Sequence, residues 1–228
     1  MDRPQDQTSR LLALIVHELR APAGVVSGYL RMLARSRALE RSTPDRQMID
    51  DASKTCARLL RVVQEIDDLC NLDDPEYVRS LDSVPLFALS DEVVREAVAN
   101  GEAVSFECPE SERSVVVRGE HGRIKRSLAA LLAFTVREHG KLPVHVTGFT
   151  DRSRPGGSAV LSFSGKDGGL TPSAVLESQS SELDRWRGGM GLLVPLACRI
   201  VEVHGGRVWS VPATPLACAL KIPLSSAS

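Results

Sequence analysis

Two stretches of helical periodicity, joined by a short turn, occupy the first third of the chain and most constrain its fold. The second stretch runs from about residue 48 to residue 69, and Pro44 suits the first turn of its helix. We therefore expect residues 1–75 to form a hairpin of two long amphipathic helices. A lone hairpin cannot cover its own apolar stripe, so two copies should pair as a four-helix bundle. The apolar residues of the first stretch recur at steps of three and four; they are Leu11, Leu12, Ile15, Leu19, Val26, Leu30 and Leu33.

Composition is that of an ordinary globular protein. The 228 residues are 43% hydrophobic and 25% charged, and the formal net charge is −1. This balance gives no reason to expect nucleic acid or an anionic membrane as a partner. Apolar runs stay shorter than the ~18 residues that span a bilayer, and the first residues lack a signal segment. We expect a cytoplasmic protein without membrane insertion and, if the chain is complete, without a sensor domain of its own.

The five cysteines are widely spaced, and none lies in a Cys-x-x-Cys pair. Neither a zinc site nor a disulfide framework is therefore indicated. We expect buried thiols.

His17 lies in the first helical stretch, off the apolar stripe, beside Glu18 and five residues before Pro22. A neutral imidazole nitrogen can attack a phosphorus centre, and a neighbouring carboxylate can accept or hold its proton. A proline inside a helix can bend it and leave a partner room to reach the histidine. The same residues are also compatible with a solvated histidine that has no catalytic role, and the hairpin with a two-helix stalk that carries out no reaction. The functional interpretation makes His17 a nucleophile and Glu18 its base.

The sequence around His17 resembles the phospho-acceptor box of bacterial sensor histidine kinases, usually Ser-His-Glu-Leu-Arg-Thr-Pro-Leu. It matches at His17, Glu18, Leu19, Arg20 and Pro22. The resemblance implies that a homodimer transfers phosphate from ATP to His17 and then to an aspartate of a response regulator receiver domain. Alanine follows Arg20 where the family has Thr or Asn, a position that orients water for dephosphorylating the response regulator, so the presence of phosphatase activity stays open.

From residue 76 onward the pattern changes to mixed α/β, and the stretch Asn71-Leu72-Asp73-Asp74-Pro75 marks the boundary. Ser90 is expected to cap a helix, and residues 170–187 are expected to form a loop. This order of elements predicts helices layered on one face of a mixed sheet. The expected helices are 91–100, 121–139 and 191–204, and the expected strands lie near 104–106, 115–117, 144–149, 159–163, 207–211 and 216–222.

The second half resembles the ATP-binding domain that follows the hairpin in histidine kinases. Residues 188–194 and 200–209 are similar to its second glycine box and the elements behind it, Gly-x-Gly-Leu-Gly-Leu…Val-x-x-His-Gly-Gly. Glycines that open a helix let backbone N–H groups approach phosphates. The resemblance implies an α/β sandwich that binds ATP with Mg²⁺. Its phosphate contacts would be Gly189, Gly191 and Leu192, with Arg137 in place of a lysine.

Other nucleotide-binding positions of the family are substituted. Its two helix asparagines, the second of which is a Mg²⁺ ligand, fall on Ala130 and Phe134. We expect Glu138, with or without His139, to serve as the metal ligand instead, although both residues also suit a solvated helix end.

The aspartate that the family uses to bind adenine falls on Gly165. If the loop slips in register, Asp167 takes this role, next to Gly169. Otherwise adenine recognition is altered or ATP binds weakly.

Three functions stay open at this point. The first is a dimeric histidine kinase that phosphorylates His17 from ATP. The second is a histidine phosphotransfer protein of the same architecture that does not use ATP; the lost asparagines and aspartate favour it, and the retained second glycine box opposes it. The third is a pseudokinase scaffold that pairs with a full kinase and does not need His17.

Overall fold

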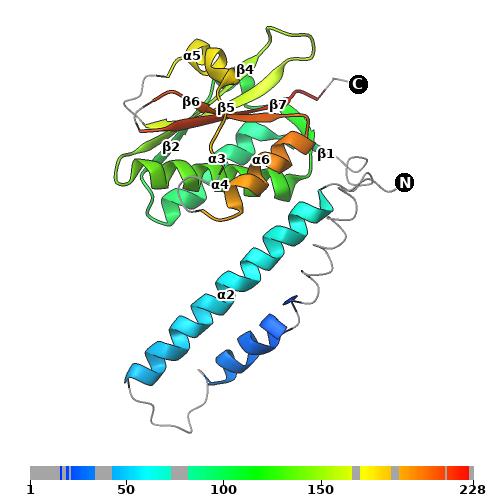
Figure 1. Cartoon of the computed structure of the whole chain (residues 1–228). Coiled ribbons are helices and arrows are strands. Elements are labelled where there is room, and N and C mark those ends of the chain that lie inside the picture. The colour runs from blue at the N-terminus through cyan, green and yellow to red at the C-terminus, as the bar shows by residue number, and fades with distance from the viewer. Residues whose placement is uncertain are drawn as a thin grey trace, which may run out of the picture. The chain divides into compact units, whose positions relative to one another are not determined.

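The computed structural model describes Val16 and residues 19–20, 22–33, 43–72, 82–165, 170–185, 190–213 and 215–225. The chain divides into two compact units, Met1–Asp73 and Asp74–Ser228. The first unit is helical and the second mixes helices with strands (Figure 1). This arrangement confirms the expected two-part fold class. No helix in these described ranges is long and apolar enough to cross a membrane.

Two helical stretches of the first unit contact one another. Residues 22–33 are helical, and α2 spans Thr43–Asn71, so Pro44 lies in its first turn as expected. The Cys56 thiol of α2 donates to the carbonyl oxygen of Ala23 at 3.3 Å. These contacts pack the two stretches as a hairpin.

Three described members of the apolar stripe expected on the first helix are exposed in the single chain. Leu19, Val26 and Leu33 expose 44%, 50% and 46% of their surface, whereas Val16 and Ala23 are buried. Covering apolar side chains stabilises a protein by about 25 cal/mol per Å². The open stripe therefore suits a second copy of the hairpin, and the four-helix bundle stays a prediction.

The second unit is built on a five-stranded mixed sheet in the order β2-β4-β5-β7-β6. Strands β2 and β4 run parallel, and the other neighbours in this sheet run antiparallel. A separate antiparallel ladder pairs β1 with β3. The strands are β1 Asp82–Pro85, β2 Val104–Glu107, β3 Val116–Gly119, β4 Val144–Asp151, β5 Ser158–Gly165, β6 Arg207–Val211 and β7 Ala217–Pro223.

Three helices, α3, α4 and α6, cover one face of the sheet, and the short α5 lies on the other (Figure 1). The main core fills the space between the sheet and the three helices. The helices are α3 Leu86–Ala99, α4 His121–His139, α5 Pro172–Glu177 and α6 Leu193–Val203, with short 3-10 turns at Glu110–Glu112 and Ser178–Ser180.

The expectation of helices on a single face was wrong, because part of the expected loop folds as α5. Thr171 caps this helix by accepting from the N–H of Ala174 at 3.3 Å. Val175 is buried in a second apolar cluster, where the Trp209 indole donates to its carbonyl oxygen at 3.1 Å. These contacts hold α5 against the sheet.

Helix α3 begins at Leu86, five residues before the expected start. Ser90 was expected to cap the helix but lies inside it, where its hydroxyl donates to the Leu86 carbonyl oxygen at 2.8 Å. Leu86, Phe87 and Leu89 are buried. Core packing therefore extends the helix beyond the apparent capping residue.

The described cysteines Cys56, Cys108, Cys198 and Cys218 are free thiols. Burial raises the pKa of Cys198 to about 11 and that of Cys218 to about 12. Both therefore stay protonated at neutral pH.

Candidate functional site

The predicted nucleophile His17 and its neighbour Glu18 lie outside the described residues. Arg20, one turn further along, is described, and its Nη2 lies 2.8 Å from Asp67 Oδ2 and 3.3 Å from Gln64 Oε1. Exposed ion pairs contribute about 0–1 kcal/mol. These contacts therefore orient Arg20 toward α2 and add little to the stability of the hairpin.

The start of α6 is the described part of the predicted phosphate turn. Gly191 has a φ of +64°, and Leu192 occupies the cap position without a side-chain hydrogen bond. The first turn of α6 holds no acidic side chain. The positive end of the helix dipole therefore suits an anion. Arg137 of α4 donates from Nη1 to Met190 Sδ at 3.8 Å, which places a cation beside this turn.

The other predicted nucleotide contacts, Asp167, Gly169 and Gly189, lie outside the described residues. Their roles stay predictions.

Apolar side chains occupy both positions at which the family carries asparagine. Phe134 is fully buried and Ala130 is 5% exposed, and both belong to the core. Among the described residues no group of three or more His, Cys, Asp or Glu side chains could hold a metal. Mg²⁺ is often held by one or two carboxylates while phosphates and waters complete its shell. The half-buried Glu138 fits this mode.

His139 does not behave as a solvated residue at a helix end, because it is only 5% exposed. Its Nε2 lies 3.2 Å from the carbonyl oxygen of Leu216, whereas its Nδ1 has no hydrogen-bond partner within the described ranges. A Cβ at Gly165 would stand 3.0 Å from Cε1 and 3.2 Å from Nδ1 of the ring. The ring therefore lies against the position at which the resemblance places the adenine-binding aspartate.

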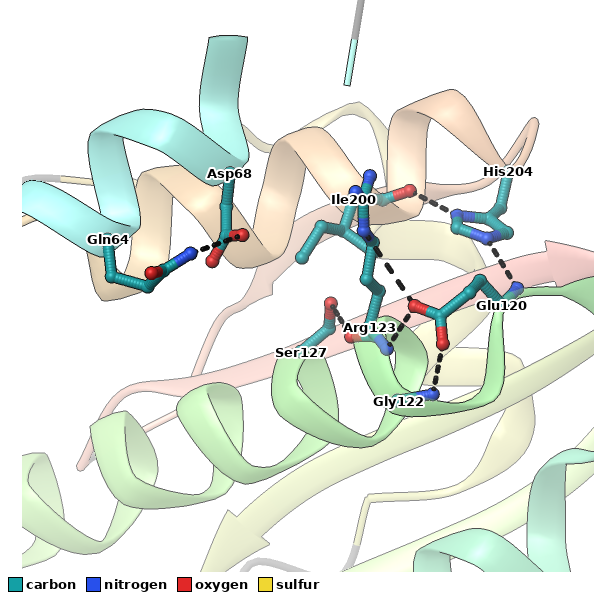
Figure 2. A network of polar contacts seen from close by, with 8 residues as sticks. All are labelled: Gln64, Asp68, Glu120, Gly122, Arg123, Ser127, Ile200 and His204. Atoms are coloured by element: carbon teal, nitrogen blue, oxygen red, sulfur yellow. Dashed lines mark hydrogen bonds and ion pairs between the residues drawn. The ribbon is translucent and has the colours of Figure 1, made fainter. Parts of the chain in front are cut away.

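A hydrogen-bond network joins the start of α4 to the end of α6 (Figure 2). His204 Nδ1 lies 2.6 Å from the Ile200 carbonyl oxygen, and the N–H of Glu120 donates to His204 Nε2 at 3.1 Å. A carbonyl can only accept, so Nδ1 carries the proton and Nε2 accepts. His204 entered the prediction only as part of the glycine motif. The neutral ring connects α4, which carries Arg137, to α6, which begins shortly after Gly191.

Glu120 also caps α4 through its side chain (Figure 2). Its carboxylate accepts from the N–H groups of Gly122 at 2.8 Å and Arg123 at 2.9 Å. An acidic N-cap satisfies helix N–H groups and complements the dipole. The single residue Glu120 therefore fixes both the start of α4 and its hydrogen bond to His204.

We predict that the stability of the second unit falls at mildly acidic pH because of His204. Burial holds the pKa of His204 below its usual value of 6.5. As the pH falls below about 6.5, His204 takes up a proton in the unfolded chain more readily than in the folded chain. Its contribution to the free energy of unfolding is therefore fully present above about pH 6.5 and is lost as the pH falls toward the folded pKa. Denaturant unfolding between pH 5 and 8 measures the effect. His204→Gln should show a smaller pH slope, and equal slopes would contradict the assignment.

Sequence comparisons match parts of this chain to known proteins. The sequence profile of the His Kinase A (phospho-acceptor) domain matches residues 7–75, which include His17. Sensor protein DivL of Caulobacter vibrioides is 23% identical over 198 residues, which cover 85% of this chain and 25% of DivL.

Two solved structures share the fold. Full-length ShkA in complex with AMPPNP is similar with a TM-score of 0.70 and 19% identity, over 96% of this chain and 46% of ShkA. Acinetobacter baumannii histidine kinase AdeS is similar with a TM-score of 0.56 and 13% identity, over 92% of this chain and 98% of AdeS. The chain thus spans 25% of the length of DivL and 46% of that of ShkA.

Proposed function

Because this chain belongs to the two-component sensor histidine kinases, we propose that it phosphorylates His17 from ATP and passes the phosphoryl group to a response regulator. The observation that carries the proposal is the phospho-acceptor domain match over residues 7–75, followed in the same chain by an α/β unit of the fold seen in ShkA and AdeS. A phosphoryl donor site and acceptor would thereby be joined in one chain. The exposed stripe of the hairpin supports a homodimer.

In the proposed reaction, a neutral nitrogen of His17 attacks the γ-phosphorus of ATP. A nitrogen–phosphorus bond forms, the bond to the bridging oxygen breaks, and ADP leaves. Glu18 accepts the imidazole proton. An aspartate of a receiver domain then attacks the phosphohistidine and takes the phosphoryl group, while the proton held by Glu18 returns to the imidazole and restores neutral His17. Such transfers depend mainly on positioning and charge neutralisation.

Two kinds of group are proposed to contact the nucleotide, a charged side chain and backbone N–H groups. Arg137 supplies a positive charge, and the uncapped start of α6 at Gly191 and Leu192 supplies oriented N–H groups. Asp167, Gly169 and Gly189 complete this proposed set. Mg²⁺, when bound, would neutralise phosphate charge, and Glu138 would be its protein ligand.

Gly191→Ala tests the phosphate turn. Among the described residues, no atom lies within 4 Å of a Cβ at Gly191, but a φ of +64° strains any residue other than glycine. The turn should relax away from the phosphate-binding geometry, and ATP affinity measured by calorimetry should fall about tenfold. The matched control is Gly156→Ala, which has a φ of +85° and equally open surroundings. Equal loss of affinity in both variants would contradict the role of Gly191.

Glu138→Gln tests the metal ligand. The amide keeps the side-chain shape but removes the charge, so the Mg²⁺ concentration for half-maximal phosphorylation should rise about tenfold. The control is Glu102→Gln, which removes an exposed carboxylate elsewhere in the unit. An unchanged Mg²⁺ dependence in the Glu138 variant would show that the metal does not bind there.

The alternative of an ATP-independent phosphotransfer protein is favoured by one specific observation, the buried hydrocarbon at Ala130 and Phe134. In that case His17 would receive its phosphoryl group from another phosphorylated protein, and Gly191→Ala would leave the transfer unchanged.

A further inference from the structure

The buried imidazole of His139, at the end of α4, has a nitrogen that forms no hydrogen bond with any residue that the structure describes. We propose that its Nδ1 binds the nucleotide base by accepting a hydrogen bond from the exocyclic amino group of adenine. This inference rests on the proposed use of ATP and makes His139 the residue that selects the base.

The tautomer of His139 follows from its surroundings. Nε2 lies 3.2 Å from the carbonyl oxygen of Leu216, and a carbonyl oxygen can only accept. Nε2 therefore carries the proton, and Nδ1 presents a lone pair. Nδ1 can therefore accept a hydrogen bond from a donor group of a ligand, whereas a ligand's acceptor group would be repelled.

The unpartnered state of Nδ1 sets His139 apart from two other histidines of the unit. Both nitrogens of His204 have partners, and His145 Nδ1 lies 2.8 Å from Ser105 Oγ. Nδ1 of His139 has no such partner among the described residues, although it is buried. Buried polar atoms without partners are rare in folded proteins, because each costs free energy that a hydrogen bond would recover. A bound ligand that brings a donor removes this cost.

The position of His139 identifies which part of a nucleotide it meets. Arg137 lies beside the start of α6, where phosphates are favoured, and His139 lies two residues further along α4. Residues two apart point to nearly opposite sides of a helix, so a ligand that contacts both lies across the C-terminal end of α4. If the phosphates are bound near Gly191, the other end of the ligand, which is the base, faces His139.

Gly165 permits this contact. It ends β5 and begins the glycine-rich run Gly165-Lys166-Asp167-Gly168-Gly169. A Cβ at Gly165 would stand 3.0 Å from Cε1 and 3.2 Å from Nδ1, so the imidazole occupies the space that a side chain at this position would need. Adenine then offers an amino donor, whereas guanine carries an acceptor oxygen at the equivalent carbon. The site should therefore select adenine.

The test compares AMPPNP and GMPPNP binding by calorimetry in the full chain and in His139→Phe, which keeps a buried ring without nitrogens. The wild-type chain should prefer AMPPNP. In the variant, AMPPNP should bind about tenfold more weakly while GMPPNP is unchanged, as expected for one lost hydrogen bond. The matched control, His121→Phe, changes an exposed histidine at the opposite end of the same helix and should have no effect.

The outcomes separate this inference from the function on which it rests. If the wild-type chain binds neither analogue, both the proposed ATP use and this inference fail. If it binds AMPPNP but the folded variant keeps the same selectivity, the inference alone is overturned.

If His139→Phe does not fold, ¹⁵N spectra of the wild-type imidazole decide the question. The Nδ1 resonance should shift on addition of AMPPNP, and an unshifted resonance with bound AMPPNP would overturn the proposal.

Discussion

Replacing His17 with alanine should abolish phosphoryl transfer, by a factor on the order of 10³ or more, because no other group replaces a missing nucleophile. The loss should extend to transfer from ATP and to transfer from a phosphorylated receiver domain, since both require the same nitrogen. The measurement follows radiolabel on the purified chain after incubation with either donor.

The control for this prediction is His145→Ala. His145 lies on β4 in the second unit, where it contacts Ser105 and Glu107. Its removal should leave labelling unchanged. Undiminished labelling of His17→Ala would instead place the phosphoryl group elsewhere, and unaltered signalling by His17→Ala in cells would favour a scaffold.

Gly206→Ala should unfold or severely destabilise the second unit. A Cβ at Gly206 would collide with the backbone carbonyl oxygen of Lys221 and stand 2.7 Å from Cγ1 of Val201. Rotating a side chain cannot relieve this clash, because the colliding atom belongs to the backbone of Lys221. This residue is held in the sheet by its pairing with Arg207 between β7 and β6. We expect the free energy of unfolding to fall by about 3 kcal/mol.

Denaturant unfolding followed by tryptophan fluorescence measures this loss, since Trp209 is fully buried in the adjacent strand β6. The control is Gly101→Ala, where a φ of +90° brings backbone strain but no atom in the described part of the chain lies within 4 Å of the added Cβ. Its cost should be about 1 kcal/mol. Gly206 has no positive φ, so equal costs for the two variants would contradict the role assigned to its close approach to β7.

Local signals predicted several elements of the second unit well. Helix α4 has the expected bounds, because an apolar pattern fills it and Gly140 ends it with a φ of +62°. Strand β6 also has the expected bounds, and the boundaries of β4 and β5 differ by only a few residues.

Elements that depend on tertiary contacts were not predicted. Strand β1 buries a single side chain, Val84, so it shows no alternating pattern. The signals for α5 were present in Thr171 and Pro172, but the stretch was interpreted as a loop because of its polar composition. Its position on the sheet depends on a hydrogen bond from the distant Trp209.

The candidate site was predictable only in part. The glycine turn at Gly191 and the nearby Arg137 follow from motif and spacing. The contact between His139 and Gly165 could not be predicted from the sequence, because it requires the end of α4 to lie against the end of β5. The tautomer of His139 likewise depends on Leu216, which lies 77 residues further along the chain.

The most direct test of the account is incubation of the wild-type chain with Mg²⁺ and γ-labelled ATP. The account predicts label on the protein that is labile in acid and stable in base, as a phosphohistidine requires, and that is absent from His17→Ala. Absence of label, together with absence of ATP binding by calorimetry, would contradict a kinase and leave a phosphotransfer or scaffold protein.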